Sequence, residues 1–233
     1  MMSVRRATAS APRLTSALVA LALTVMALAS APVAAALTSI SPGDELDGVG
    51  ARGTARCTLG YAFTDPATGV SYAITAGHCN AGHSSYVLDR TTGALGHFAL
   101  TVASPEDPLA DDYGLIDFGS NHSQRVMYGM PIGGISAPDP RNAVCHDGIR
   151  TGVVCGSFGG RLVGRQYLTT GMAQSIPGDS GGPVWQLSAD NTATATVIGI
   201  WLGEHFDGNG SRYGRFIGLT DILVDVADET HVL

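Results

Sequence analysis

A serine set among glycines is the first feature of this sequence that suggests chemistry. Ser180 lies in the run Pro177-Gly178-Asp179-Ser180-Gly181-Gly182-Pro183. Glycines permit a sharp turn and the close approach of a substrate. The amide N–H groups of Gly178 and Ser180 could then bind the oxygen of a carbonyl group under attack. A tight turn between two strands would also explain the run, but its composition favours a nucleophilic serine with an oxyanion hole.

A serine hydroxyl needs a general base, and the sequence offers a histidine in a suitable setting. His78 follows an apolar run in the segment Thr75-Ala76-Gly77-His78-Cys79, where small residues leave its imidazole uncrowded. The base in turn needs a carboxylate that orients it and stabilises its cation. Asp112 stands directly before an apolar run at 113–118 and is preferred to Asp111, although either acid could simply cap a turn. These motifs predict a catalytic triad of Ser180, His78 and Asp112.

Short strands must position these residues, because the sequence lacks long amphipathic helical patterns. Glycine is abundant at 31 of 233 residues, and charged residues make up only 14%. Runs of β-branched and apolar residues recur between Gly, Pro, Asp and Asn, at 70–75, 113–118, 161–164, 183–187 and 197–202. Many short strands at this spacing indicate an all-β barrel or sandwich. The Gly- and Pro-containing stretch 120–141 reads as a connection between two halves.

The last residues are the one part with a helical pattern. Thr220 could cap a turn that carries Ile222, Leu223 and Val226 on one side. A short C-terminal helix is therefore expected.

The first 36 residues resemble a secretory signal peptide rather than part of the fold. Arg5, Arg6 and Arg13 precede an apolar run at 17–29, and small residues follow as far as Ala36. The apolar run is shorter than the roughly 20 residues that a permanent anchor needs. An uncleaved anchor is the alternative. We predict a signal peptide at 1–36, a secreted extracellular protein, a short N-terminal segment at 37–52 and one domain at 53–233.

The expected mature chain is acidic. All 13 basic residues are Arg, three of them within 1–36, so 10 Arg face 20 acids and the net charge is −10 with neutral His. Such a surface repels nucleic acid and anionic lipid, so we expect neither as a partner.

Four cysteines follow the expected signal peptide. An even number in an exported chain indicates two disulfides. Three pairings are open, and the simplest is the local one, Cys57–Cys79 and Cys145–Cys155. A zinc site is the rival interpretation, but no cysteine lies two residues from another. We expect no metal.

The order His, Asp, Ser and the motifs T-A-G-H-C, D-Y-G and G-D-S-G-G resemble the chymotrypsin-like serine peptidases. The similarity is greatest to the bacterial branch that includes the streptogrisins and alpha-lytic protease. Residues 144–156 look like that branch's disulfide loop, and Arg56-Cys57-Thr58-Leu59-Gly60-Tyr61 looks like its opening segment. The resemblance covers roughly 40–220. It implies two packed six-stranded antiparallel β-barrels, at about 53–125 and 142–233, with the triad in the cleft between them.

The chain departs from this branch near the expected specificity pocket. The resemblance assigns Gln174, Trp201, Leu202 and Glu204 to that pocket, where relatives have smaller residues around a serine. The bulk of Trp201 would narrow it. Glu204 could attract a basic side chain, or it could lie at a solvated rim.

A second departure lies beside the nucleophile. His146 stands where the bacterial relatives have Arg, so we expect Asp179 to pair with His146 or Arg150. Further along, the run 207–210 has a faint similarity to a calcium loop, but a hairpin turn explains it better.

The sequence therefore predicts a secreted, monomeric serine endopeptidase that hydrolyses peptide bonds of peptide or protein substrates through an acyl-enzyme, without a cofactor. The alternative is a catalytically weak two-barrel binding or adhesion protein that retains the triad, and Trp201 and Leu202 support it. An esterase with the same triad would be expected to carry a G-x-S-x-G elbow, which Ser180 lacks.

Overall fold

The structure is a computed structural model, and it describes residues 37–80, 82–188 and 193–232. The predicted signal peptide lies outside these residues. Within them, no helix is long and apolar enough to cross a membrane.

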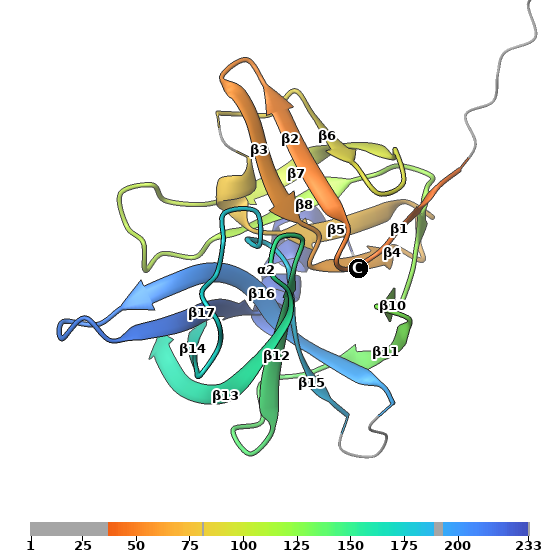
Figure 1. The fold of residues 1–233 in the computed structure, drawn as a ribbon. Helices are drawn as coiled ribbons and strands as arrows, with labels where there is room; N and C mark the ends of the chain where they lie inside the picture. The colour runs from red at the N-terminus through yellow and green to blue at the C-terminus, as the bar shows by residue number, and fades with distance from the viewer. Residues whose placement is uncertain (1–36, 81, 189–192, 233) are drawn as a thin grey trace, which may run out of the picture. The chain divides into compact units, whose positions relative to one another are not determined.

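The first half of the described chain forms a curled seven-stranded sheet (Figure 1). Its strands lie in the order β3-β2-β6-β7-β8-β5-β4. Their bounds are β2 (Glu45–Gly50), β3 (Gly53–Thr58), β4 (Tyr61–Thr64), β5 (Ser71–Thr75), β6 (Tyr86–Asp89), β7 (Leu95–Val102) and β8 (Tyr113–Asp117). A short 3-10 helix, η1 (Gly77–Cys79), follows β5 directly. The strand β1 (Ser39–Ile40) pairs in parallel with β9 (His122–Ser123).

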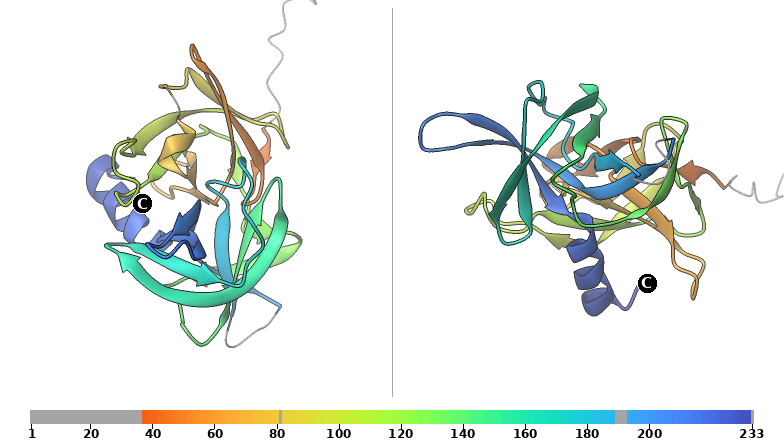
Figure 2. Two further views of the ribbon diagram at one scale, coloured as in Figure 1. Left: turned by 60° about the vertical axis from the view of Figure 1, so that its left-hand side comes forward. Right: turned by 90° about the horizontal axis from the view of Figure 1, so that it is seen from below.

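The second half forms one sheet, most of which closes into a barrel. Its strands run β10 (Val126–Met127), β11 (Met130–Ile135), β12 (Ala143–Gly148), β13 (Gly152–Val163), β14 (Gln166–Thr170), β15 (Pro183–Leu187), β16 (Ala195–Phe206) and β17 (Arg212–Gly218). The sheet order is β10-β11-β16-β15-β12-β13-β14-β17. A further pairing of β16 with β17 closes the strands from β16 to β17 in this order into a barrel, while β10 and β11 extend the sheet beyond the ring. The β16–β17 hairpin projects from the barrel (Figure 2). The predicted all-β, two-barrel fold is confirmed, with one barrel closed and the other a curled sheet.

The segment 37–52 takes part in this fold. The sequence predicts a short segment at 37–52 that precedes a domain at 53–233. Instead it supplies β1 and β2, and β2 pairs with both β3 and β6.

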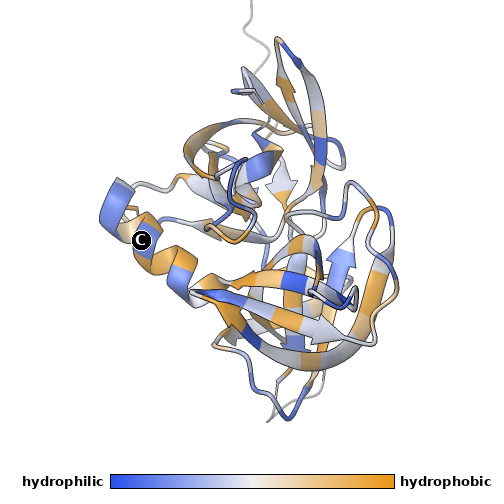
Figure 3. Ribbon diagram, turned by 90° about the vertical axis from the view of Figure 1, so that its left-hand side faces the viewer, coloured by the Kyte–Doolittle hydropathy of each residue, from blue (hydrophilic) through white to orange (hydrophobic). Residues whose placement is uncertain are grey.

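The predicted C-terminal helix is present as α2 (Leu219–Thr230) (Figure 3). Its buried residues include the expected Ile222, Leu223 and Val226. The expected cap is wrong, because the N-cap is Gly218, two residues before Thr220, and no side chain caps the helix. The chain reaches α2 directly from β17, which leaves no loop in which Thr220 could cap. Burying apolar side chains of this size contributes about 1.5–3 kcal/mol each.

Both predicted disulfides are present, and both tie together elements that matter for the site. Cys57 at the end of β3 is bonded to Cys79 in η1. Cys145 and Cys155 face each other directly across the β12–β13 ladder and are bonded as well. The run 207–210 is the turn of the β16–β17 hairpin, as expected, and its acid Asp207 accepts the N–H groups of Asn209 and Ser211.

Candidate active site

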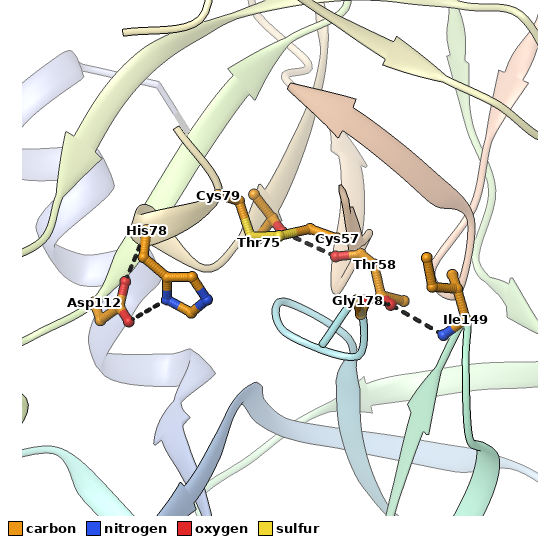
Figure 4. Close-up of a disulfide and its surroundings, with 8 residues drawn as sticks. All are labelled: Cys57, Thr58, Thr75, His78, Cys79, Asp112, Ile149 and Gly178. Carbon is orange, nitrogen blue, oxygen red and sulfur yellow. Dashed lines mark hydrogen bonds and ion pairs between the residues drawn. A yellow bond between two sulfur atoms is a disulfide. The ribbon is translucent and has the colours of Figure 1, made fainter. Parts of the chain in front are cut away.

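Antiparallel pairing of β5 with β8 brings the predicted base to the predicted carboxylate. Thr75 lies opposite Gly114 in this ladder, so the residues that follow β5 meet those that precede β8. The Oδ2 atom of Asp112 lies 2.6 Å from Nδ1 of His78, and its Oδ1 accepts the His78 backbone N–H at 2.8 Å (Figure 4). Two hydrogen bonds to one carboxylate hold both the ring and its backbone. The His78 side chain is 44% exposed, so a ligand can reach it.

The alternative acid has another role. Asp111 forms an ion pair with Arg165, which also pairs with Asp225 on α2. Asp112 alone of the two aspartates contacts His78.

Ser180 sits in the turn before β15, and backbone contacts hold that turn against the chain leading to His78. The Ser180 carbonyl accepts the N–H of Thr58 at 2.8 Å. The next residue, Gly181, is packed so closely that an added Cβ would lie 2.0 Å from Thr75 Oγ1 and 3.0 Å from the Ala76 nitrogen. Gly181 also has φ +86°, which disfavours other residues. The nucleophile turn therefore lies beside the segment that ends in His78.

Several atoms of this site have no partner among the described residues. The side chains of Ser180 and His78 are not hydrogen-bonded to each other. Such bonds are often long in a free enzyme and tighten when substrate binds. The amide N–H groups of Gly178 and Ser180 likewise meet no acceptor in the described part of the chain. Both amides are thus available to a ligand oxygen.

The acid before the nucleophile is held differently from the expectation. Asp179 is buried, and no ion pair joins it to His146 or Arg150 within the described residues. Its Oδ1 accepts the backbone N–H groups of Arg150 and Thr151, each at 3.1 Å, and its Oδ2 accepts that of Ile176 at 2.8 Å. Hydrogen bonds from several amides stabilise a carboxylate without a cation. The expected pairing with the His146 or Arg150 side chain is therefore replaced by amide contacts.

His146 stays neutral at physiological pH in this setting. Its ring is fully buried, and neither ring nitrogen has a hydrogen-bond partner among the described residues. Burial lowers its pKa to about 4, although the nearby charge of Asp179 acts in the opposite direction. The ring stacks on Trp201 with the centroids 3.9 Å apart.

The four residues predicted for the specificity pocket do not gather around an open space. Trp201 is fully buried, and Leu202 is nearly so. Gln174 is exposed. Glu204 pairs with Arg212 at 2.7 Å, so its charge is already matched.

A cavity lies instead on another side of His78. It has a volume of about 510 Å³ and is lined by His78, Asp112 and the loop between β7 and β8, including Pro105 and Pro108. Arg215 also lines it, and its Nε atom is buried without a partner among the described residues. The sequence analysis missed Arg215, since a single Arg in a strand carries no local signal.

Sequence reasoning also missed Thr58. Its hydroxyl donates to the Gly178 carbonyl at 2.8 Å and accepts the N–H of Ile149 at 3.1 Å (Figure 4). It thereby ties the loop that carries the candidate oxyanion donors to β3. Thr58 lies in the segment 56–61, which resembles the opening segment of the bacterial proteases, and this resemblance was the signal in the sequence that could have identified it.

One group of metal-ligating atom types lies at the site, namely those of Cys57, His78 and Cys79. The two sulfur atoms are bonded to each other, so they are not free to bind a metal ion.

Comparisons with known proteins concern the sequence and the fold. No protein-family model matches the chain. An uncharacterized protein of Mycobacterium tuberculosis, found in two strains as MT1863 and Rv1815, is 34% identical over 160 residues, which is 62% of this chain. The chain spans 66% of the length of these relatives.

Solved structures give a broader match. Protease A of Thermobifida fusca superposes with a TM-score of 0.60 at 21% identity, covering 82% of this chain and 97% of that protein. A protease of Nocardiopsis gives a TM-score of 0.59 at 21% identity, with 81% and 96% covered. The predicted resemblance is thus confirmed at the level of fold. The chain has the chymotrypsin-like fold of the bacterial serine proteases.

Proposed function

We propose that this protein is a secreted serine endopeptidase with Ser180 as nucleophile, His78 as general base and Asp112 as the residue that orients His78. The observation that carries the proposal is the double hydrogen bond of Asp112 to His78, next to a turn that presents Ser180. The two disulfides fit an oxidising, extracellular location.

In the proposed reaction these residues act in two stages, acylation and deacylation. As Ser180 Oγ attacks the substrate carbonyl, its proton passes to Nε2 of His78, and Asp112 stabilises the resulting imidazolium through Nδ1. The N–H groups of Gly178 and Ser180 bind the oxyanion that forms. His78 then gives its proton to the departing amine, which leaves an acyl-enzyme. Water attacks the ester by the same route and releases the carboxylic acid.

The cavity beside His78 gives the substrate chain a place to bind. Proline and alanine side chains from the β7–β8 loop line much of it, and the exposed face of His78 opens onto it. A peptide bound there would contact His78 and Asp112, two of the three proposed triad residues.

A fluorophosphonate probe tests the proposal, because it phosphonylates only an activated serine. The parent protein should be labelled and should cleave casein. Ser180→Ala should abolish labelling and lower peptide turnover by about 10⁶-fold while the protein stays folded. Ser136→Ala, which removes a hydroxyl directly after the end of β11, is the matched control and should change neither.

Undiminished cleavage by Ser180→Ala would exclude the proposed nucleophile. Labelling without cleavage of casein or any peptide would favour the alternative, a binding protein with a preserved triad, for which the complete burial of Trp201 is the supporting observation.

A further inference from the structure

We propose that the indole ring of Trp201 fills the space in which the substrate side chain next to the scissile carbonyl would be bound, so that the protein cleaves after Gly or Ala. This inference rests on the proposed function, because it names the substrate class of the same site. It begins from the position of the Trp201 backbone.

That backbone is bonded directly to the nucleophile turn. The N–H of Gly181 donates to the Trp201 carbonyl at 2.7 Å, and the N–H of Trp201 donates to the Gly182 carbonyl at 2.8 Å. Strand β16 therefore runs alongside the residues that follow Ser180. In the proposed reaction, the carbonyl oxygen of the acyl group on Ser180 lies at the Gly178 and Ser180 amides, and the leaving group lies toward His78. The remaining substituent of that carbonyl carbon, which carries the substrate side chain, is then directed to this strand.

The ring of Trp201 lies behind the turn, in the closed barrel. Its N–H donates to Ser175 Oγ at 3.0 Å, five residues before the nucleophile. One face stacks on His146 of β12 with an interplanar angle of 9°. On the β17 side, a Cβ added to Gly214 would lie 2.2 Å from the indole. The ring thus spans the space between β12, β17 and the loop before Ser180.

The fit leaves little freedom to the indole. Trp201 is 0% exposed and packs in a buried cluster with Val184, Ile198 and Phe216. Its hydrogen bond and its stack both favour the observed orientation. A substrate side chain could enter only if this ring moved, which would break both contacts.

The two polar side chains expected at this pocket, Glu204 and Gln174, offer no free charge to a charged substrate side chain. The Glu204 carboxylate accepts the N–H of Ser175 at 2.9 Å and is paired with Arg212. Gln174 is exposed and uncharged. Neither a basic nor an acidic substrate residue would find a matching partner among these groups.

The parent protein gives the first test, with chromogenic peptides that differ only in the residue before the scissile bond: Gly, Ala, Phe, Arg or Glu. Adding several methylene-sized groups where no space exists should lower kcat/KM by at least about 100-fold. We expect Ala and Gly to be cleaved and Phe, Arg and Glu to lie below them by that factor. Equal or faster cleavage after Phe, Arg or Glu would overturn the inference.

A substitution gives the second test. Trp201→Ala should open an apolar space and raise the Phe-to-Ala ratio of kcat/KM by about 100-fold. The matched control is Trp185→Ala, which removes the chain's other tryptophan from β15, where it lines a different cavity beside the Cys145–Cys155 disulfide. That variant should leave the ratio unchanged. An unchanged ratio in Trp201→Ala would also overturn the inference, and Trp201→Leu takes its place if the alanine variant does not fold.

A third experiment distinguishes failure of the proposed function from failure of this inference. Diisopropyl fluorophosphate is a small reagent that needs no side-chain pocket, so it should label Ser180 in the parent protein. If it does not, the enzyme proposal fails, and binding of free indole decides the inference. Saturable stabilisation of Trp201→Ala by indole, absent from the parent and from Trp185→Ala, would support a filled space, whereas no such binding would refute it.

Discussion

Two buried aspartates in the first sheet make the stability of the protein depend on pH, and one substitution can test this dependence. Asp44, in the turn before β2, and Asp89, at the end of β6, are 9% and 0% exposed. Burial, followed by the negative charge of Asp89, raises the pKa of Asp44 to about 7. The Oδ2 atom of Asp44 accepts the Ser41 N–H at 2.6 Å, and Asp89 accepts the N–H of Thr91 at 2.8 Å. The folded protein thus keeps a proton on Asp44 at mildly acidic pH.

The sign and size of the effect follow from this pKa. An unfolded chain loses the Asp44 proton near its ordinary pKa of 3.8, while the folded protein retains it up to about 7. Stability therefore falls as pH rises across that window, because folding must hold the proton or bury a charge. The whole difference corresponds to ~4 kcal/mol. Since the two carboxyl groups titrate together, we expect about half of it, ~2 kcal/mol, to be recovered by removing one charge.

The substitution Asp44→Asn should recover this part of the stability. The amide resembles the protonated acid, and its oxygen can still accept the Ser41 N–H. We expect the variant to exceed the parent by ~2 kcal/mol at pH 8, or about 4–8 °C in Tm. The gain should shrink toward zero as pH falls to 4.

Urea unfolding of both proteins at pH 4, 6 and 8 measures this, with Asp228→Asn, an exposed position on α2, as the control. Equal stability of Asp44→Asn and parent at pH 8, or the same gain at pH 4 and 8, would refute the reasoning.

Two further predictions concern the second barrel. Because the folded protein keeps His146 neutral down to about pH 4, this histidine contributes a loss of stability as pH falls from 6.5 to 4, by up to ~3 kcal/mol, opposite in sign to the contribution of Asp44. His146→Phe, which keeps a ring against Trp201, should lack that loss in acid unfolding curves; the same slope in both proteins would contradict it. Replacing Cys145 and Cys155 together by Ser opens a loop with a sequence separation of 10, and should lower the free energy of unfolding by about 3 kcal/mol. A double variant that unfolds at the parent's urea midpoint would show that the bridge does not stabilise the barrel.

Local signals in the sequence were enough to predict the candidate triad and the fold class. Ser180, His78 and Asp112 each lie at the boundary of a short apolar strand, and such boundaries are encoded within a few neighbouring residues. The hairpin turn at 207–210 and the C-terminal helix could be predicted for the same reason. The helix cap could not, because whether Gly218 or Thr220 comes first depends on where β17 ends, and β17 ends where its pairing with β14 and β16 stops.

Contacts between distant segments were decided only by the tertiary structure. The sequence left three pairings open for the cysteines, and the β12–β13 register placed Cys145 opposite Cys155. The Asp179 carboxylate accepts hydrogen bonds from the backbone N–H groups of Arg150 and Thr151 rather than pairing with a cation, because the fold brings these two N–H groups to its Oδ1 atom. The sequence showed that Trp201 is bulky, but not that its ring would be enclosed by β12, β17 and the turn before Ser180. Packing of that kind depends on strands that lie tens of residues apart, and only the closed barrel brings them together.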